Sequence, residues 1–340
     1  MKILITGGAG FIGTNTAMRF LSQGWSVVLL DNCSRKGAEF NLADLRAVGP
    51  FELIRADVRR PEAVTAALRA HGDADIVLHL AGQVAVTTSV QDPRSDFEDN
   101  ALGTFNVLEA LRTAGFPGLM IYSSTNKVYG SMGSAGVVEG PSRYSYRGFP
   151  EGIGEEQPLD FHSPYGCSKG AADQYVRDYA RIYGLKTVVF RQSCIYGPHQ
   201  YGVEDQGWLA WFTIAAATGR PLTVYGNGKQ VRDVLYVDDL AEAYRKAFEC
   251  RDRCAGAVFN VGGGPRNTLS LLELIERLNA ALGIRIAVRF EDWRPGDQPV
   301  FIADIRRMQE RLGWAPRTSV GDGLGRVLAW VQAHRDRFVR

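Results

Sequence analysis

The stretch "KILITGGAGFIG" (Lys2–Gly13) decides the fold. Its first five residues are an apolar run that predicts a buried strand, and closely spaced glycines follow without a gap. Gly7, Gly10 and Gly13 satisfy the spacing G-x-x-G-x-x-G. Gly8 begins the related spacing G-x-G-x-x-G. Such glycines permit a tight turn from strand to helix and let backbone amides approach a pyrophosphate at the helix N-terminus. The stretch therefore predicts the first unit of a dinucleotide-binding sheet.

Further apolar runs alternate with helical segments through the first half of the chain. "SVVLLD", "FELIRAD", "DIVLHLA" and "GLMIYSS" predict strands, and "KTVVFRQ" (Lys186–Gln192) predicts a sixth. Continuous apolar strands that alternate with helices are typical of a parallel sheet covered on both faces. We expect an α/β protein with a Rossmann-type doubly wound parallel sheet over residues 1–192, to which a segment at about 230–262 returns. A smaller mixed α/β domain is expected over residues 193–229 and 263–340.

The pattern of apolar segments changes in the second half of the chain. "PLTVYGNG" and "RIAVRF" predict shorter strands, while Thr268–Leu282 and residues 320–338 predict helices. One long segment, Ser131–Ser163, is rich in Gly, Pro, Tyr and Arg and is expected to be irregular. A loop of that length in a compact domain is usually functional, although a surface insertion is the alternative.

The composition sets limits on function. The 340 residues are 45% hydrophobic and 22% charged, with a net charge of +2, so no global field favours nucleic acid or a membrane surface. We expect no signal peptide and no membrane span, because the first residues are a strand and no apolar run approaches the length of a span. The five cysteines lack a disulfide or metal spacing; only Cys250 and Cys254 stand at i, i+4. We therefore expect no metal and a reduced, cytoplasmic enzyme.

Asp31 is the next element of the cofactor site. It ends the second strand 18 residues after Gly13, where a carboxylate can accept hydrogen bonds from the adenosine ribose. Because a carboxylate there repels a 2′-phosphate, NAD is favoured over NADP, although Arg35 and Lys36 nearby weaken that preference. Asp57 ends the third strand, where it can meet the adenine amino group.

The fourth strand ends in "HLAGQV", at the crevice where doubly wound sheets bind their ligands. His79 precedes this turn and is expected to be a packed strand residue and not a catalyst. The predicted cofactor site comprises Gly7, Gly10, Phe11, Ile12, Gly13, Asp31, Asn32, Ser34, Arg35, Asp57, Val58, Leu80, Ala81, Gly82, Gln83, Asn100, Ser123, Tyr165 and Lys169.

Tyr165 and Lys169 supply a candidate acid-base group. They form Y-x-x-x-K, so they share one face of a helix. A tyrosine is a poor base at neutral pH, but a neighbouring ammonium and a positive nicotinamide ring lower its pKa. Tyr165 can then take a hydroxyl proton while the carbon loses hydride to NAD. Thr125, at the end of the fifth strand, can donate a hydrogen bond to the same oxygen.

Together these motifs resemble the extended short-chain dehydrogenase/reductase family of nucleotide-sugar epimerases and dehydratases. The resemblance covers essentially the whole chain and includes "RQSCIYGP", "GNGKQVRDVLYVDDLAEAY" and "RPGD". It implies that the smaller domain binds the nucleotide sugar. It also implies that Arg232 and Arg294 clamp the diphosphate, a role that guanidinium groups suit. Cys194 stands where many members of the family have an asparagine that contacts the diphosphate, so that contact is in doubt.

The residues after Thr125 help to separate the activities in this family. Dehydratases of the family carry Asp-Glu there, because elimination needs an acid for the leaving hydroxyl and a base for the adjacent proton. This chain has Asn126 and Lys127 instead. The resemblance therefore favours epimerisation, in which the sugar is oxidised to a ketone, reorients and takes the hydride back on its other face.

Longer strings, including "HLAGQVAVTTS", "YSSTNKVYG", "LDFHSPYGCSKGAADQY" and "DQGW", resemble epimerases that act at C2 of CDP-hexoses. The resemblance implies bound NAD, conversion of CDP-paratose to CDP-tyvelose or of CDP-glucose to CDP-mannose, and a homo-oligomer, with a tetramer favoured over a dimer. A UDP-sugar 4-epimerase is the alternative, and a non-catalytic NAD-binding sensor is an alternative of another class. The predicted substrate site comprises Gln83, Thr87, Thr125, Asn126, Cys194, Gln206, Trp208, Tyr225, Arg232 and Arg294.

Overall fold

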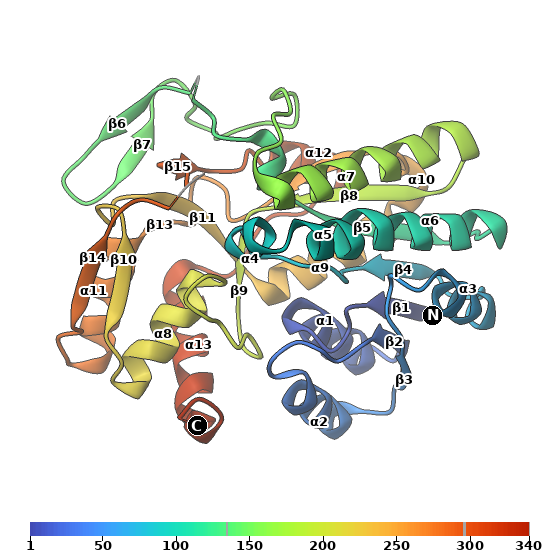
Figure 1. Ribbon diagram of the computed structural model, residues 1–340, viewed down its shortest axis with the longest axis horizontal. Helices are drawn as coiled ribbons and strands as arrows, with labels where there is room; N and C mark the ends of the chain where they lie inside the picture. Colours follow the sequence, from blue (N-terminus) through green and yellow to red (C-terminus); the bar gives the residue numbers. More distant parts are fainter. Residues whose placement is uncertain (134, 295–296, 340) are drawn as a thin grey trace.

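A seven-stranded parallel sheet forms the centre of the computed structural model, which describes residues 1–133, 135–294 and 297–339. The strand order is β12-β8-β5-β4-β1-β2-β3 (Figure 1). The predicted doubly wound sheet is therefore confirmed. Its strands are β1 (Lys2–Thr6), β2 (Ser26–Asp31), β3 (Glu52–Arg55), β4 (Ile76–His79), β5 (Leu119–Thr125), β8 (Thr187–Gln192) and β12 (Val258–Val261).

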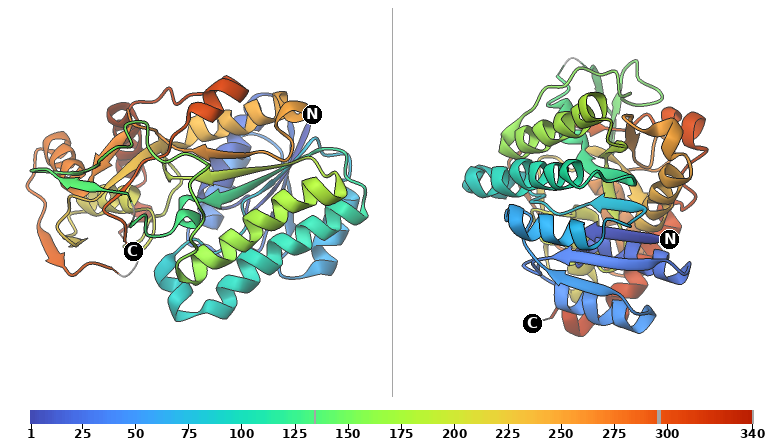
Figure 2. Two further views of the ribbon diagram at one scale, coloured as in Figure 1. Left: turned by 90° about the horizontal axis from the view of Figure 1, so that it is seen from above. Right: turned by 90° about the vertical axis from the view of Figure 1, so that its right-hand side faces the viewer.

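Helices cover both faces of this sheet (Figures 1 and 2). One face carries α1 (Phe11–Ser22), α2 (Ala38–Val48), α9 (Val237–Glu249), α10 (Arg251–Cys254) and α12 (Arg306–Leu312). The other carries α3 (Pro61–Ala70), α5 (Pro93–Phe97), the π-helical turn η1 (Glu98–Leu102), α6 (Gly103–Thr113) and α7 (Ser163–Tyr183), with α4 (Val86–Gln91) beside α7. Fully buried side chains such as Phe20 and Tyr244 on the first face, and Val107 and Val176 on the second, fill the two layers.

A smaller part packs beside one end of the sheet (Figure 2). Its central strand is β11 (Val231–Tyr236), which pairs with β9 (Cys194–Tyr196), β13 (Thr268–Ser270) and β15 (Val300–Phe301). A second ladder joins β10 (Leu222–Tyr225) to β14 (Val288–Glu291), and the helical elements are α8 (Trp208–Thr218), α11 (Leu271–Leu282), α13 (Val320–Ala333) and the 3-10 turn η3 (Arg335–Arg337). The segment expected to return to the large sheet divides: β11 lies in the smaller sheet, whereas β12 is a strand of the larger sheet and α9 packs on it. The domain boundaries remain a prediction.

Three local expectations differ from the structure. Thr268–Ser270 is a strand and not the first turn of a helix, because Ser270 caps α11 in a capping box with Glu273. The segment Ser131–Ser163 contains a hairpin of β6 (Val137–Glu139) and β7 (Tyr144–Tyr146), and so is not wholly irregular. The last helix ends at Ala333, before the expected residue 338.

The order of the strands places a crevice beside β1. The chain passes from β1 to β2 on one side, and β4 pairs with β1 on the other side. The loops after β1 and β4 therefore separate at the carboxyl edge of the sheet, where doubly wound sheets bind their ligands. The glycine loop (residues 7–10) and the residues after His79 both lie at this edge. The 3-10 turn η2 (Asn126–Tyr129) follows β5 at the same edge.

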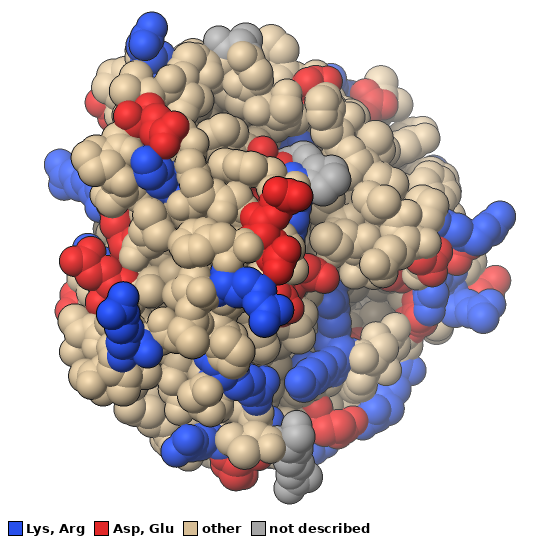
Figure 3. Space-filling view, turned by 60° about the vertical axis from the view of Figure 1, so that its left-hand side comes forward, with Lys and Arg blue, Asp and Glu red and all other residues tan. Residues whose placement is uncertain are grey.

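Acidic and basic side chains are interspersed over the face of the molecule that Figure 3 shows. Within the described residues, no helix combines the length and the apolar character that crossing a membrane requires.

Candidate active site

A cavity of about 620 Å³ lies at the carboxyl edge of the sheet and extends to the smaller part. It is lined by the loops after β1, β2, β3, β4 and β5, by the start of α7, and by a segment from Gln192 to Leu209. All predicted cofactor residues except Asn100 line it. Of the predicted substrate residues, Gln83, Thr125, Cys194, Gln206 and Trp208 line it. The cavity thus joins the predicted cofactor site to part of the predicted substrate site.

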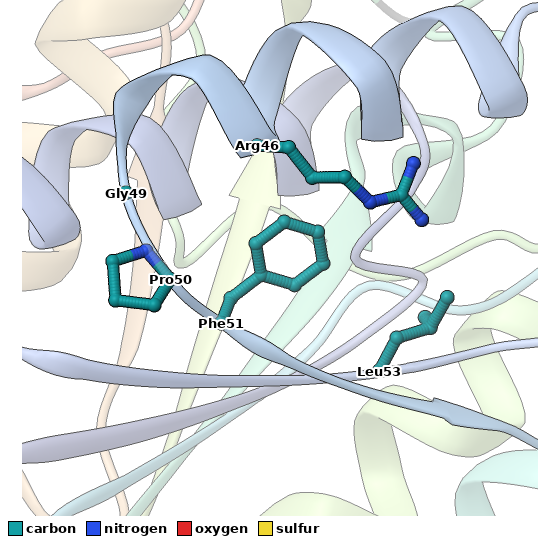
Figure 4. A pocket seen from close by; sticks show the side chains of 5 residues that line it. All are labelled: Arg46, Gly49, Pro50, Phe51 and Leu53. Carbon is teal, nitrogen blue, oxygen red and sulfur yellow. The ribbon is translucent and has the colours of Figure 1, made fainter.

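A second, smaller hollow lies elsewhere on the sheet domain. Arg46, Gly49, Pro50, Phe51 and Leu53 line it, between the end of α2 and β3 (Figure 4). It contains none of the predicted site residues.

The glycine loop fits the close approach of a phosphate group. At Gly7, where φ is +70°, an added Cβ would lie 2.7 Å from the backbone nitrogen of Ala81. At Gly13 it would lie 2.4 Å from the carbonyl oxygen of Gly7. Gly10 begins α1 without a capping side chain, so the first amides of the helix are left for a ligand. Side chains at Gly7 and Gly13 would collide with backbone atoms, so the tight loop that leaves these amides open, the glycine cradle, requires glycine at both positions.

Asp31 is held at the end of β2 by backbone amides. Its Oδ2 accepts from the amide of Ala9 at 2.9 Å and its Oδ1 from that of Cys33 at 2.7 Å. Burial raises the pKa of this carboxyl, and the two amide hydrogen bonds oppose that shift. The predicted adenine contact, Asp57, accepts from Arg59 and from Asn32, which hold its pKa below the ordinary value.

Thr125 and Tyr165 meet in the cavity. Thr125 ends β5, and its Oγ1 accepts from the amide of Lys127 at 3.2 Å, which caps the turn η2. Tyr165 lies in the first turn of α7, and its amide donates to Oγ of Ser89 at 3.1 Å. Its phenol is hydrogen-bonded to Thr125, and burial raises the pKa of Tyr165 to about 12. The two hydroxyls predicted to act on one substrate oxygen are therefore neighbours.

Lys169 lies one helical turn further along α7, but its ammonium group faces the sheet. Nζ donates to the carbonyl oxygen of Ser123 at 2.5 Å and lies 4.4 Å from the centre of the Tyr122 ring. Burial lowers the pKa of Lys169 to about 7, although Asp173 and Asp96 oppose that shift. We expected Lys169 to lower the pKa of Tyr165, whereas burial dominates the pKa of the phenol here.

The predicted substrate residues fall into two groups. In the cavity, Cys194 Sγ lies 3.5 Å from Nε1 of Trp208, and Gln206 accepts from Arg35 at 3.0 Å. Outside its lining stand Thr87, Asn126, Tyr225, Arg232 and Arg294.

Arg294 is bound to neighbouring protein groups. Its guanidinium lies 3.7 Å from the centre of the Tyr225 ring and forms an ion pair with Asp205 at 2.9 Å. A diphosphate would have to displace that carboxylate. Residues 295–296 of the "RPGD" motif lie outside the described residues. Arg232 donates to the carbonyl oxygen of Val231 at 2.9 Å. Burial lowers the pKa of Lys127 to about 8, and the charge of Arg232 adds to that shift.

The expectation for His79 is confirmed. The ring is fully buried between Thr6 and Thr104, at 2.6 and 3.0 Å, and burial lowers its pKa to about 3. It packs within the strand layer and does not line the cavity.

The sequence does not predict two buried carboxylates, one on α7 and one beside it. Asp173, on α7, pairs with Arg191 at 2.9 Å and accepts from Ser124 at 2.8 Å. Asp96, on α5, is 1% exposed and accepts from Ser168 at 2.5 Å. Neither aspartate belongs to a sequence motif that would predict its burial, since a single acidic residue in a polar helical segment normally faces solvent.

Comparison with known proteins agrees with the geometry of the site. The model of the NAD dependent epimerase/dehydratase family matches residues 3–262. A CDP-paratose 2-epimerase of Salmonella typhi is 46% identical over 98% of this chain and 100% of that protein. A crystal structure of a UDP-glucose 4-epimerase with UDP-glucose, from Thermotoga maritima, is 30% identical with a TM-score of 0.84, covering 98% and 99% of the two chains. A UDP-glucose 4-epimerase of Thermus thermophilus in complex with NAD is 31% identical with a TM-score of 0.81, covering 98% and 100%.

Proposed function

The chain belongs to the NAD dependent epimerase/dehydratase family, and within it we propose that this protein inverts C2 of a CDP-hexose through a transient 2-keto sugar. The observation that carries the proposal is the meeting of Thr125 and Tyr165 in one cavity with the glycine loop. The 46% identity to a CDP-paratose 2-epimerase supports the position of attack and the nucleotide.

The residues of the cavity fit NAD. The glycine cradle at the start of α1 suits the pyrophosphate, and the carboxylate of Asp31 suits the adenosine ribose. When bound, NAD supplies a reversible hydride acceptor, which an epimerisation needs so that no net redox change remains. Lys169 and Ser123 line the cavity and are proposed to contact its nicotinamide half.

Tyr165 and Thr125 act on the hydroxyl that becomes a carbonyl. In the structure the contact with Thr125 lowers the pKa of Tyr165, and Oγ1 of Thr125 also donates to Oδ1 of Asn126 at 3.4 Å. A sugar hydroxyl that enters between them can give its proton to Tyr165 and accept a hydrogen bond from Thr125. The pKa of about 12 means that the phenolate needs additional positive charge, which Lys169 and the cofactor ring are expected to supply.

The residues after Thr125 favour epimerisation over elimination. Asn126 is 8% exposed and its Oδ1 lies 3.4 Å from Oγ1 of Thr125, so an amide stands where a dehydratase would need an acid. Lys127 offers an ammonium near Arg232, not a carboxylate. Neither side chain carries out the paired acid-base work of water loss.

The substrate is proposed to be CDP-paratose or CDP-glucose. Gln83 and Gln206 line the cavity and are proposed to hold sugar hydroxyls or the nucleotide. Arg232 and Arg294 are proposed to bind the diphosphate, which for Arg294 requires release of Asp205.

We also propose a homo-oligomer that works in the cytoplasm. Large apolar and aromatic side chains on the outer faces of the α5–α7 layer are exposed, as a second copy would require: Phe97 56%, Phe105 37%, Tyr175 50%, Ile182 66% and Tyr183 52%. All five cysteines are free thiols, which suits a reducing compartment.

Incubation with CDP-paratose, CDP-glucose and UDP-glucose in deuterated water tests the proposal, with the products read by NMR. We expect inversion at C2 of a CDP-sugar without deuterium incorporation, because the hydride that leaves C2 returns to it. The variant Tyr165→Phe should lower turnover by roughly 10²–10⁴-fold while NAD stays bound. Inversion of UDP-glucose at C4 with both CDP-sugars unchanged would replace this proposal by a 4-epimerase, and deuterium at C2 would move the oxidation to a neighbouring carbon.

A further inference from the structure

Asp96 is the centre of a buried polar cluster that joins the cavity wall to the catalytic helix. Its Oδ1 accepts from Nε2 of Gln83 at 3.0 Å and from Nδ2 of Asn100 at 3.1 Å. Its Oδ2 accepts from Oγ of Ser168 at 2.5 Å. Ser168 stands between Tyr165 and Lys169 in α7, and it also accepts from Asn100 at 3.1 Å. One carboxylate therefore holds Gln83 and the first turns of α7 in place.

The charge of Asp96 has no cation in direct contact. Its hydrogen-bond donors are neutral, and among the described residues no arginine, lysine or histidine lies within ion-pair distance of it. Three donors to one carboxylate favour its ionised form, although burial raises its pKa. Lys169 is likewise buried and bonded to a neutral carbonyl oxygen. Asp96 and Lys169, neither of which is in an ion pair among the described residues, thus flank Ser168 inside the protein.

We propose that Asp96 is a positioning residue whose charge keeps Lys169 protonated and whose hydrogen bonds fix the start of α7 and Gln83 together. The proposal deepens the proposed function, on which its kinetic consequences rest. The protonation of Lys169 itself depends only on the fold.

The electrostatic surroundings of the two catalytic groups agree with this role. Burial lowers the pKa of Lys169, and Asp173, on its own helix, and Asp96, on α5, raise it again. Asp173 is already shared with Arg191 of β8, whereas Asp96 has no such partner. On β4, His79 is neutral because burial lowers its pKa to about 3, and on β5 the ring of Tyr122 lies beneath the ammonium.

Asp96 also acts on Tyr165. Its charge raises the pKa of the phenol, while the hydrogen bond from Thr125 and the charge of Arg35, across the cavity, lower it. Removal of the Asp96 charge should therefore lower the pKa of both Lys169 and Tyr165. Both limbs of the pH profile of kcat/KM should move to lower pH, whereas loss of a purely structural contact would lower the profile without moving it.

The direct test is an NMR titration of the protein as purified, with 13C-labelled lysine. The chain has seven lysines (Lys2, Lys36, Lys127, Lys169, Lys186, Lys229 and Lys246), so the Lys169 resonance can be assigned by its loss in Lys169→Arg. We expect Asp96→Asn to lower its titration midpoint by about half to one pH unit, since a nearby charge shifts a pKa by roughly 1–3 units and Ser168 intervenes here. Asp96→Ser makes the same measurement should Asp96→Asn not fold.

Two controls separate charge from contact. Ser168→Ala removes the bridging hydroxyl and leaves the carboxylate, so the midpoint should stay near that of the wild type while kcat falls. Asp178→Asn removes an equal charge from the exposed side of α7 and should leave both midpoint and kcat unchanged. An unchanged Lys169 midpoint in folded Asp96→Asn would overturn the proposal. Because this titration needs no substrate, its result stands even if no CDP-sugar is turned over.

Discussion

The buried ion pair between Asp173 and Arg191 allows the sharpest prediction about stability. The carboxylate is fully buried and the guanidinium is 3% exposed. Two hydrogen bonds join them, from Nε to Oδ2 at 2.9 Å and from Nη2 to Oδ1 at 3.0 Å. The variant Asp173→Asn keeps the volume but leaves the arginine charge without its partner. Breaking such a pair costs about 3–5 kcal/mol, because the remaining charge is still out of water.

Urea unfolding of the wild type and the variant measures this change as a difference in free energy of unfolding. Asp252→Asn is the matched control, because Asp252 pairs with Lys186 at 2.7 Å where the two side chains are 72% and 42% exposed. We expect that control to lose at most about 1 kcal/mol. Replacing both members of the buried pair, with Asp173→Leu and Arg191→Met, should recover much of the loss. Equal losses for Asp173→Asn and Asp252→Asn would refute the reasoning.

Three further predictions concern the cofactor and the pH dependence of stability. Gly13→Ala should abolish the retention of NAD through purification, because the added Cβ would lie 2.4 Å from a backbone oxygen. Retention is measured as the nicotinamide nucleotide released on denaturation. The control Gly325→Ala, at an exposed position with open space around it, should retain NAD. Asp31→Ser should weaken NAD binding by roughly 10-fold or more and reduce the preference for NAD over NADP, since the 2′-phosphate is no longer repelled. Calorimetry measures both affinities, and an unchanged preference for NAD would contradict this role of Asp31. Burial lowers the pKa of His199 to about 4 and of His79 to about 3. Both imidazoles therefore stay neutral in the folded protein at pH values where those of the unfolded chain gain protons. The free energy of unfolding should therefore fall as pH drops below about 6.5, by about 2 kcal/mol for each histidine at pH 5, and unfolding curves at pH 8 and pH 5 measure this change. The variant His199→Gln should show a smaller pH dependence. The same pH dependence in that variant and in the wild type would contradict the prediction.

The sequence predicted those parts of the fold that depend on local pattern. β1 and β2 are continuous apolar runs that end in a glycine turn and an aspartate, and both have the expected boundaries. Thr268–Ser270 was misassigned because its apolar periodicity continues into α11, while the strand is determined by pairing with β11. That pairing depends on a partner at least 35 residues away in the chain, the separation of Asp233 and Thr268, which no local window contains.

The same distinction applies to the predicted substrate site. The resemblance assigns Arg294 to the diphosphate, but it does not reveal that Asp205, the first residue of the "DQGW" string, forms an ion pair with it. Asn100 was predicted to line the cofactor site. In the structure its amide donates to Asp96 and Ser168 behind the cavity wall, because the π-helical turn η1 directs it toward α7. Motif spacing identifies a residue as important, and packing decides which groups it contacts.

The proposed catalytic residues illustrate why spacing alone is insufficient for a mechanism. Y-x-x-x-K places Tyr165 and Lys169 on one helix face, yet their protonation depends on groups that this spacing does not include. Burial of this site opposes both forms that the reaction needs at neutral pH, because it lowers the pKa of Lys169 to about 7 and raises that of Tyr165 to about 12. A buried anion beside the lysine corrects one of these shifts but makes the other worse. In the structure Asp96 raises the pKa of both groups, while Thr125 and Arg35 lower the pKa of Tyr165. We therefore expect a change of charge at Asp96 to alter the pH of maximal activity. A change at the neutral Thr125 should instead alter the rate of the reaction.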